Sequence, residues 1–269
     1  MLTLIIGALT ATACAFLATL LLDGWFFPGL AGVAGFLAVT VPLNLWVKRR
    51  LEAIFQGIQS KIGDNQAVMQ RKVNMMANKM MSSTKGIQRQ IEKQQVAVIK
   101  EALNDLDCVG ALQKWNLLAE RQSNTLRGQL CFQIREFDKA DTYFERSLAF
   151  DPLTVAMKMT RAYKKDDLAT VEKLFKRGKR RFKGEKGALI YALYAWILLK
   201  QDRVEDAIPI LEAGKDKTED LTLRTNWEHL VNGRPRSFSN AGLGDMWYAL
   251  QLETPKAVRA KQRGGGHRR

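Results

Sequence analysis

Apolar residues fill the first part of the chain almost without interruption. Residues 2–22 and 25–46 form two apolar runs. Each has about twenty residues, enough to cross a hydrocarbon core of about 30 Å as a helix. Asp23 is the only charged residue before position 48, and with Gly24 it marks the turn between the runs. The pattern predicts a transmembrane helical hairpin over residues 1–47.

Small residues recur along both apolar runs at spacings of three or four. They are Gly7, Ala11, Ala15 and Ala18 in the first run, and Gly29, Gly32 and Gly35 in the second. Small side chains at such positions let two helix backbones approach closely. Membrane helices are also rich in Gly and Ala for general reasons, so the sequence leaves both interpretations open.

Between Leu51 and Ala102 the apolar residues follow a helical period. They recur about every 3.6 residues, which places them on one face of a helix. The stripe consists of Phe55, Ile58, Ile62, Met69, Val73, Met76, Met80, Ile87, Ile91, Val98 and Ala102. The glycine-containing stretches at 63–65 and 82–86 are alternative places for a break. We therefore predict a basic helical linker over 48–94, made of two or three helices, that separates the hairpin from the rest of the chain.

Five methionines lie within this linker: Met69, Met75, Met76, Met80 and Met81. Flexible thioether side chains form adaptable binding surfaces, and they also fill irregular gaps between packed helices. The packing role includes association with a second copy as an irregular coiled coil, although the spacing is not a strict heptad. A homo-oligomer held by the hairpin or by this methionine-rich helix is one expectation.

The clearest motif is REFDKADTYFERSLAFDP, which ends at Pro152. Counted from Gly128, Ala140 lies twelve residues on, Phe144 sixteen and Pro152 twenty-four, and Cys131 lies between the first two. This spacing resembles the tetratricopeptide (TPR) repeat family. In that family two antiparallel helices touch at small residues, an aromatic residue fills the groove, and Pro ends the unit. Cys131 takes the place of the usual Tyr of the first helix. The resemblance implies helical hairpins that bind other proteins.

Three further segments repeat the second-helix register of this motif less completely. They carry Ala111 with Trp115, Val171 with Phe175, and Ala207 with Leu211. Positions 111, 140, 171 and 207 are 29, 31 and 36 residues apart. These intervals are close to the TPR period of about 34 residues. Hairpins stacked in series form an α-solenoid with one continuous core. The predicted fold class is all-α: a transmembrane hairpin, a long helical linker, and a TPR-like α-solenoid over 95–253.

The solenoid is expected to end in capping helices within residues 220–253, because a repeat stack needs a cover over its last apolar face. Trp247 and Tyr248 are candidates for this cap, and alternatively for anchoring a partner. Residues 254–269 contain glycine and positive charge but little to bury, which predicts a disordered basic tail.

The distribution of charge along the chain predicts the orientation of the protein in the membrane. The 269 residues include 42 Lys and Arg against 27 Asp and Glu, a formal net charge of +15, and every basic residue follows Val47. The positive-inside rule places Lys48, Arg49 and Arg50 on the cytoplasmic side. We therefore expect an integral protein of the bacterial inner membrane with both termini and the repeats in the cytoplasm. A cleaved signal sequence is the alternative, but it calls for a basic residue ahead of the first apolar run, and none is present.

A second basic cluster comprises Lys176, Arg177, Lys179, Arg180, Arg181 and Lys183. Together with the cluster after Val47 it is a candidate contact for a polyanion. For a tethered protein the anionic membrane surface is the nearest one. Nucleic acid is not expected, because Phe182 is the only aromatic residue interleaved with these charges.

Residue types that carry catalysis or bind metals are sparse. The three cysteines form no C-x-x-C pair, and two histidines cannot build a histidine metal site. The segment KGEKGA lacks the spacing of a phosphate-binding loop. We therefore expect no enzymatic activity, no cofactor and no metal.

Taken together, these features predict a membrane-anchored TPR-like scaffold or adaptor that recruits or positions protein partners at the cytoplasmic face. The alternative is a structural subunit of an oligomeric membrane complex or secretion-related complex. The repeat motif specifies a scaffold and leaves the identity of the partner open.

Overall fold

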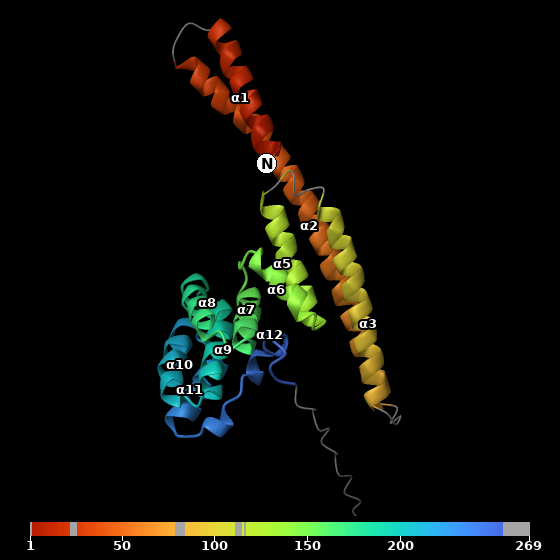
Figure 1. Ribbon diagram of the computed structural model, residues 1–269, viewed down its shortest axis with the longest axis vertical. Coiled ribbons are helices and arrows are strands. Elements are labelled where there is room, and N and C mark those ends of the chain that lie inside the picture. The colour runs from red at the N-terminus through yellow and green to blue at the C-terminus, as the bar shows by residue number, and fades with distance from the viewer. Residues whose placement is uncertain (1, 22–25, 79–83, 111–114, 116, 255–269) are drawn as a thin grey trace, which may run out of the picture. The chain divides into compact units, whose positions relative to one another are not determined.

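The computed structural model describes every residue except 1, 22–25, 79–83, 111–114, 116 and 255–269 (Figure 1). The described residues are mostly helical and contain no strand, which confirms the all-α class. Contacts divide the chain into two compact units, Met1–Leu148 (unit 1) and Ala149–Arg269 (unit 2). The division falls inside the range 95–253 that was predicted as one solenoid.

Unit 1 begins with two apolar helices that pack side by side. Helix α1 (Leu2–Leu21) lies against the first part of α2 (Phe27–Asn78). Both are long and apolar enough to cross a membrane, over Leu2–Leu20 and within Phe27–Asn65.

Glycines bring these two helices into close contact and show that they run antiparallel. A Cβ atom added at Gly7 would lie 2.9 Å from the ring of Phe36, one at Gly35 would lie 2.6 Å from the Sγ of Cys14, and one at Gly32 would lie 3.4 Å from the Cβ of Ala15, so the contacts run in opposite order along the two helices. Gly29, by contrast, has no atom within 4 Å of such a Cβ. Of the two interpretations that the sequence left open, close backbone approach therefore holds at Gly32 and Gly35.

Helix α2 continues for 52 residues. It passes through Pro42, which lacks a backbone donor but does not end the helix, and through the stretch 63–65, one of the alternative places for a break. This stretch stays helical because one glycine costs a helix only about 1 kcal/mol. The same helix also crosses the predicted domain boundary after Val47. The other alternative, at 82–86, lies partly outside the described residues.

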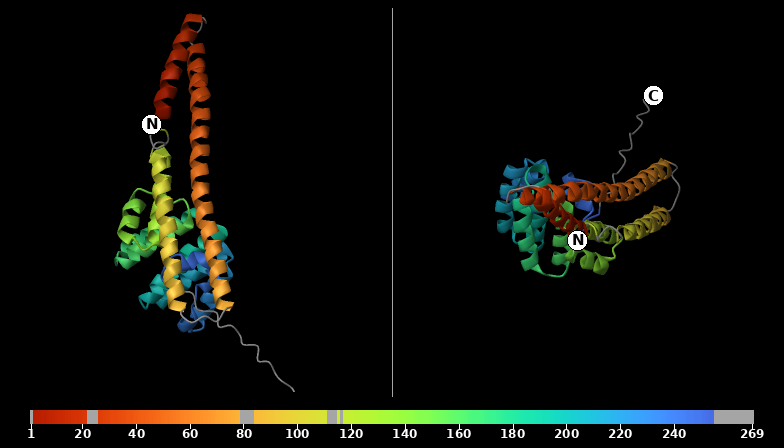
Figure 2. Two further views of the ribbon diagram at one scale, coloured as in Figure 1. Left: turned by 90° about the vertical axis from the view of Figure 1, so that its right-hand side faces the viewer. Right: turned by 90° about the horizontal axis from the view of Figure 1, so that it is seen from above.

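Helix α3 (Thr84–Asp105) runs back along α2 (Figure 2). Lys61 Nζ on α2 lies 2.6 Å from Asp105 Oδ2 and 3.4 Å from Glu101 Oε1 on α3. Both carboxylates raise the pKa of Lys61, and the hydrogen bond to Asp105 has the larger effect. The predicted linker is therefore an antiparallel hairpin, and the expectation that it holds the following helices away from the apolar pair is wrong. Two amphipathic helices can cover each other's apolar faces only if the chain turns back.

One hydrophobic core joins this hairpin to the helices after it. The core is built from α2, α3, the 3-10 helix η1 (Leu106–Val109) and α5 (Leu117–Gln133). Its buried members are Leu51, Ile58, Ile99, Ala102, Leu106, Val109, Ala119 and Leu130. Ile58 and Ala102 lie near opposite ends of the predicted stripe and meet in this core. The methionine side chains assigned to binding or oligomerisation lie outside the described part of the chain.

The same turn ends four helices. A residue with positive φ follows the helix in each case: Arg135, Asp166, Asp202 and Gly233. Its N–H donates to the carbonyl three residues back, and the next N–H donates to the carbonyl five residues back. This is the Schellman pattern of helix ends. The four turns are 31, 36 and 31 residues apart, so the chain contains an internal structural repeat.

The first three turns each join two helices into a hairpin. The pairs are α5 with α6 (Phe137–Glu145), α7 (Pro152–Lys164) with α8 (Leu168–Arg181), and α9 (Ala188–Lys200) with α10 (Val204–Thr218). Within unit 2, α9 also contacts α7 and α8, and α11 (Leu221–Val231) contacts α10 and α9. Neighbouring hairpins of unit 2 therefore share one core.

Equivalent positions in the three hairpins are buried. Five residues after the positive-φ residue stand Ala140, Val171 and Ala207, and nine residues after it stand Phe144, Phe175 and Leu211. A Cβ at Gly128 would lie 2.6 Å from the ring of Phe144, so the first hairpin closes on a glycine.

After the fourth turn, short helices replace the second helix of the hairpin. They are η3 (Pro235–Ser237), η4 (Ala241–Leu243) and α12 (Asp245–Tyr248). Trp247 is fully buried, and its Nε1 donates to Glu253 Oε2 at 2.9 Å, while Trp196 Nε1 of α9 donates to the other carboxylate oxygen at 2.7 Å. The carboxylate of Glu253 thus fastens the last described segment to α9. A buried Trp247 fits the capping role and not the partner-anchoring one.

Candidate functional site: a cationic face on helix α8

Local interactions stabilise both ends of helix α8. Its first turn is capped by Asp167, whose carboxylate accepts the backbone N–H of Thr170 at 3.0 Å. Hydrogen bonds from the Thr170 side chain and backbone lower the pKa of Asp167. The last turn carries Lys179, Arg180 and Arg181, where positive charge interacts favourably with the helix dipole.

One side of α8 is packed into unit 2. Val171, Phe175 and Gly178 are buried there, and the ring of Phe175 stacks on Tyr194 of α9 with centroids 4.0 Å apart. A Cβ at Gly178 would lie 3.1 Å from Ile190 Cγ2, so the two helices are in close contact. This packing fixes which residues of α8 can face outward.

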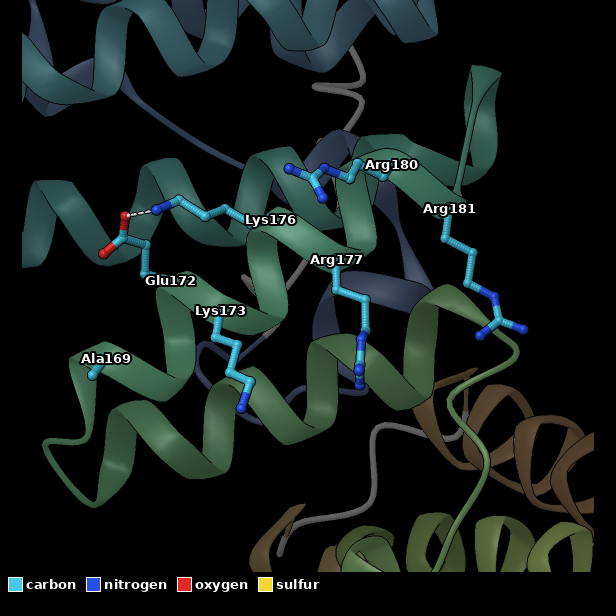
Figure 3. Close-up of a pocket in the computed structure, with 7 residues that line it drawn as sticks. All are labelled: Ala169, Glu172, Lys173, Lys176, Arg177, Arg180 and Arg181. Atoms are coloured by element: carbon cyan, nitrogen blue, oxygen red, sulfur yellow. Dashed lines mark ion pairs between the residues drawn. The ribbon is translucent and has the colours of Figure 1, made fainter.

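The outward side of α8 is strongly basic. Seven residues line a depression of about 600 Å³, shown in Figure 3: Ala169, Glu172, Lys173, Lys176, Arg177, Arg180 and Arg181. Their spacing of three or four residues is that of one helix face. We call the five basic residues of this set the cationic face.

Only one acidic residue lies among these seven. Glu172 Oε1 is 2.6 Å from Lys176 Nζ, and this contact lowers the pKa of Glu172. On the neighbouring helix α7, Lys158 is half-buried; burial, and then the charge of Arg177, lower its pKa. The cationic face therefore carries more positive charge than its single carboxylate can balance.

The structure brings together four of the predicted basic residues and separates the others. Lys176, Arg177, Arg180 and Arg181 line the depression. Lys179 instead lies over the ring of Phe175, with Nζ 5.2 Å from the centroid, and Lys183 is exposed beyond the end of the helix.

The first predicted basic cluster, which follows Val47, is elsewhere. Lys48, Arg49 and Arg50 are exposed on α2 in unit 1, where Lys48 Nζ lies 3.7 Å from Glu52 Oε1. Lys173 belongs to the cationic face and was missed in the sequence. Its helical spacing from Lys176 and Arg177 was the available signal.

The predicted repeat-packing residues are found in several elements. Pro152 is the first residue of α7. Trp115 stands in the turn before α5, and the backbone carbonyl oxygen of Trp115 accepts a hydrogen bond from the hydroxyl of Thr3 at 2.9 Å. Ala111 lies outside the described residues. Cys131 is buried in α5, and burial raises the pKa of its thiol, which disfavours the reactive thiolate.

Among the residues that the structure describes, no three His, Cys, Asp or Glu side chains come together in a way that could hold a metal ion. The cationic face, with five basic residues on one side of α8, is the candidate functional site of unit 2. Its chemistry is the binding of negative charge.

Comparisons of the chain with protein-family models, with curated proteins and with solved structures find no match.

Proposed function

We propose that this protein is a membrane-anchored helical-repeat scaffold that recruits or positions partner proteins at the cytoplasmic face of the membrane. The single observation that carries the proposal is the combination, in one chain, of an apolar helical pair and a four-fold repeated helix-ending turn. The first element suits anchoring, and the second builds the hairpins from which binding scaffolds are made.

Exposure of the apolar pair supports the membrane anchor. Only 17% of the residues in the apolar window of each helix are buried, and large side chains such as Leu9, Phe16 and Leu30 are more than half exposed. The core helix of a water-soluble protein would bury such residues, because continuous apolar surface of this extent is unfavourable in water. Lipid would cover it. The exposed cluster Lys48, Arg49 and Arg50 supports a cytoplasmic location for the rest of the chain.

The repeated turn supports the scaffold role. Three hairpins bury a small or β-branched residue and a large apolar residue at the same distances from the turn. Such hairpins form a binding surface from side chains that the core does not use, and this surface can differ from repeat to repeat. The TPR resemblance noted in the sequence agrees with this role, and an α-solenoid is the arrangement we propose for it.

Site-specific photocrosslinking in native membranes tests the proposal. A benzoylphenylalanine at Asp138 on α6 or Glu205 on α10, both exposed, should trap defined cytoplasmic proteins. The same probe at Leu9 on α1 should trap lipid or membrane proteins only. Absence of protein adducts at both hairpin positions would contradict the scaffold function. A large, defined homo-oligomer in detergent, with adducts only to itself, would favour the structural subunit instead.

A further inference from the structure

The cationic face of α8 has an unusual balance of charge. It gathers Lys173, Lys176, Arg177, Arg180 and Arg181 along about three turns of one helix, with Glu172 as the only acid among them. Exposed helix faces ordinarily alternate acids and bases, because like charges at spacings of three and four repel each other. A ligand that supplies negative charge along the helix would remove this repulsion.

One carboxylate of the protein itself already pairs with a lysine of this face. The carboxylate of Glu172 lies 2.6 Å from the ammonium of Lys176, within the range of a charge-assisted hydrogen bond. Arg177, Arg180 and Arg181 offer guanidinium groups, which are well suited to carboxylates because their planar donors can bind both oxygens. Carboxylates repeated along a peptide would match groups repeated along α8.

Packing disfavours a lipid bilayer as the occupant. A helix that binds the membrane interface needs apolar side chains to insert beside its basic ones. Val171 and Phe175 of α8 are buried in the core of unit 2, Leu174 is partly buried, and the exposed Leu168 lies at the first residue of the helix, ahead of the basic residues.

Nucleic acid fits less well for a different reason. Single strands are held by aromatic side chains that stack on bases between the basic residues. None of the seven residues that line the depression is aromatic, and the exposed ring of Phe150 nearby already contacts the Arg181 guanidinium, whose Cζ lies 4.5 Å from the ring centroid.

We propose that the cationic face of α8 is the docking surface for an acidic segment of a partner protein, whose carboxylates pair with Lys173, Arg177 and Arg180. The inference rests on the proposed scaffold function and names the chemistry of its partner. Because the photocrosslinking positions on α6 and α10 avoid α8, failure of the two ideas can be told apart.

The test uses the full chain in nanodiscs of neutral phosphatidylcholine. Fluorescence anisotropy measures the binding of a labelled peptide rich in glutamate, and of the same peptide with every glutamate replaced by glutamine. The site variant combines Lys173→Gln, Arg177→Gln and Arg180→Gln. Its matched control combines Arg224→Gln, Arg234→Gln and Arg236→Gln, which removes the same charge from exposed positions elsewhere in unit 2.

We expect the glutamate peptide to bind and the glutamine peptide not to bind. The site variant should weaken binding about tenfold, as three exposed ion pairs predict, and the control should change it less than twofold. Binding should weaken as NaCl rises from about 0.05 M to about 0.5 M. Circular dichroism should give the same helix content for all variants, because the substitutions keep long side chains that favour helix.

Three results would overturn the inference. Equal losses in both triple variants would mean that net charge alone attracts the peptide. Binding of the glutamine peptide as tightly as the glutamate peptide would exclude carboxylate recognition. Tighter, site-dependent binding of phosphatidylglycerol vesicles or of a single-stranded oligonucleotide would assign the face to lipid or to nucleic acid.

Discussion

Single residues decide how closely the helices of this protein can approach. Gly128 and Phe144 show this most directly, because the aromatic ring occupies the space that a Cβ at position 128 would need. Gly35 and Cys14 do the same between α1 and α2. Glycines elsewhere in the same helices, such as Gly57 and Gly29, have open space around them. The same residue type thus has two different roles, and the sequence alone does not distinguish them.

Replacing Gly128 by Ala should destabilise the protein. The new methyl group would lie 2.6 Å and 2.7 Å from two ring carbons of Phe144, a ring that is only 3% exposed and has little room to move. We expect a loss of about 1–3 kcal/mol in the free energy of unfolding, measured by chemical denaturation followed by circular dichroism. Gly57→Ala is the matched control and should stabilise α2 by about 0.5–1 kcal/mol. Stabilisation by both substitutions would refute the close contact of α5 with α6.

Asp167 predicts a pH dependence of stability. Its folded-state pKa lies below its usual value of 3.8, so its ionised form stabilises α8 above that value. This contribution is lost as pH falls through the lowered pKa. Asp167→Asn keeps a capping oxygen but does not titrate. Between about pH 5 and about pH 2, the midpoint of thermal unfolding should therefore fall more in the wild type than in this variant. Parallel curves for the two proteins would show that the cap carboxylate does not titrate in this range.

At the scale of helices, pairing depends on which faces meet. The α1/α2 pair meets along glycines, whereas α2 and α3 meet along larger apolar side chains and an ion pair from Lys61. The three repeat hairpins use a third arrangement. A positive-φ residue ends the first helix of each hairpin, and a small or β-branched residue of the second helix is buried five residues later. Each pairing follows from the residues at the contact rather than from helix propensity.

A disulfide between neighbouring positions tests the antiparallel α1/α2 contact. The Cβ of residue 35 would lie 3.0 Å from the Cβ of Cys14, somewhat closer than the usual separation of about 3.8 Å in disulfides. With a small backbone shift, Gly35→Cys should therefore form an intrachain bond with Cys14 on mild oxidation in membranes. Counting free thiols with a maleimide reagent under denaturing conditions should show two fewer than before oxidation. Gly29→Cys should lose none. A disulfide-linked dimer would instead place a second copy at this contact.

For the molecule as a whole, the proposed anchor fixes the side of the membrane on which the repeats act. Apolar residues dominate before position 48, and all basic residues lie from that position onward. Because the apolar and basic parts of the chain are separate, the orientation of the protein in the membrane depends on a few positive charges next to the apolar segment, where the positive-inside rule operates.

Neutralising these charges should disturb the orientation. In the wild type, green fluorescent protein fused after Arg269 should fluoresce and alkaline phosphatase at the same place should be inactive. Lys48→Gln, Arg49→Gln and Arg50→Gln together should give a mixed population, because the charge bias next to the apolar helix is lost. The same number of substitutions at Arg224, Arg234 and Arg236 should have no effect. Active phosphatase in the wild type would reverse the proposed topology.

Much of this protein was predictable from local sequence. The two apolar helices, the helical period after Leu51 and the register of Ala140, Val171 and Ala207 all follow from interactions between residues a few positions apart. Helix periodicity and helix ends depend on such short distances, so the pattern of residues was sufficient for them.

Only the tertiary structure decided which of these helices face each other. The return of α3 along α2, the glycine contact at Gly35 and the isolation of Lys179 from the cationic face depend on contacts that the local pattern does not specify. An apolar stripe specifies that a face is buried but not what buries it, because hydrophobic attraction has no direction. The cationic face emerged for the same reason: packing of Phe175 and Gly178 inward determined which basic residues of α8 remained together outside.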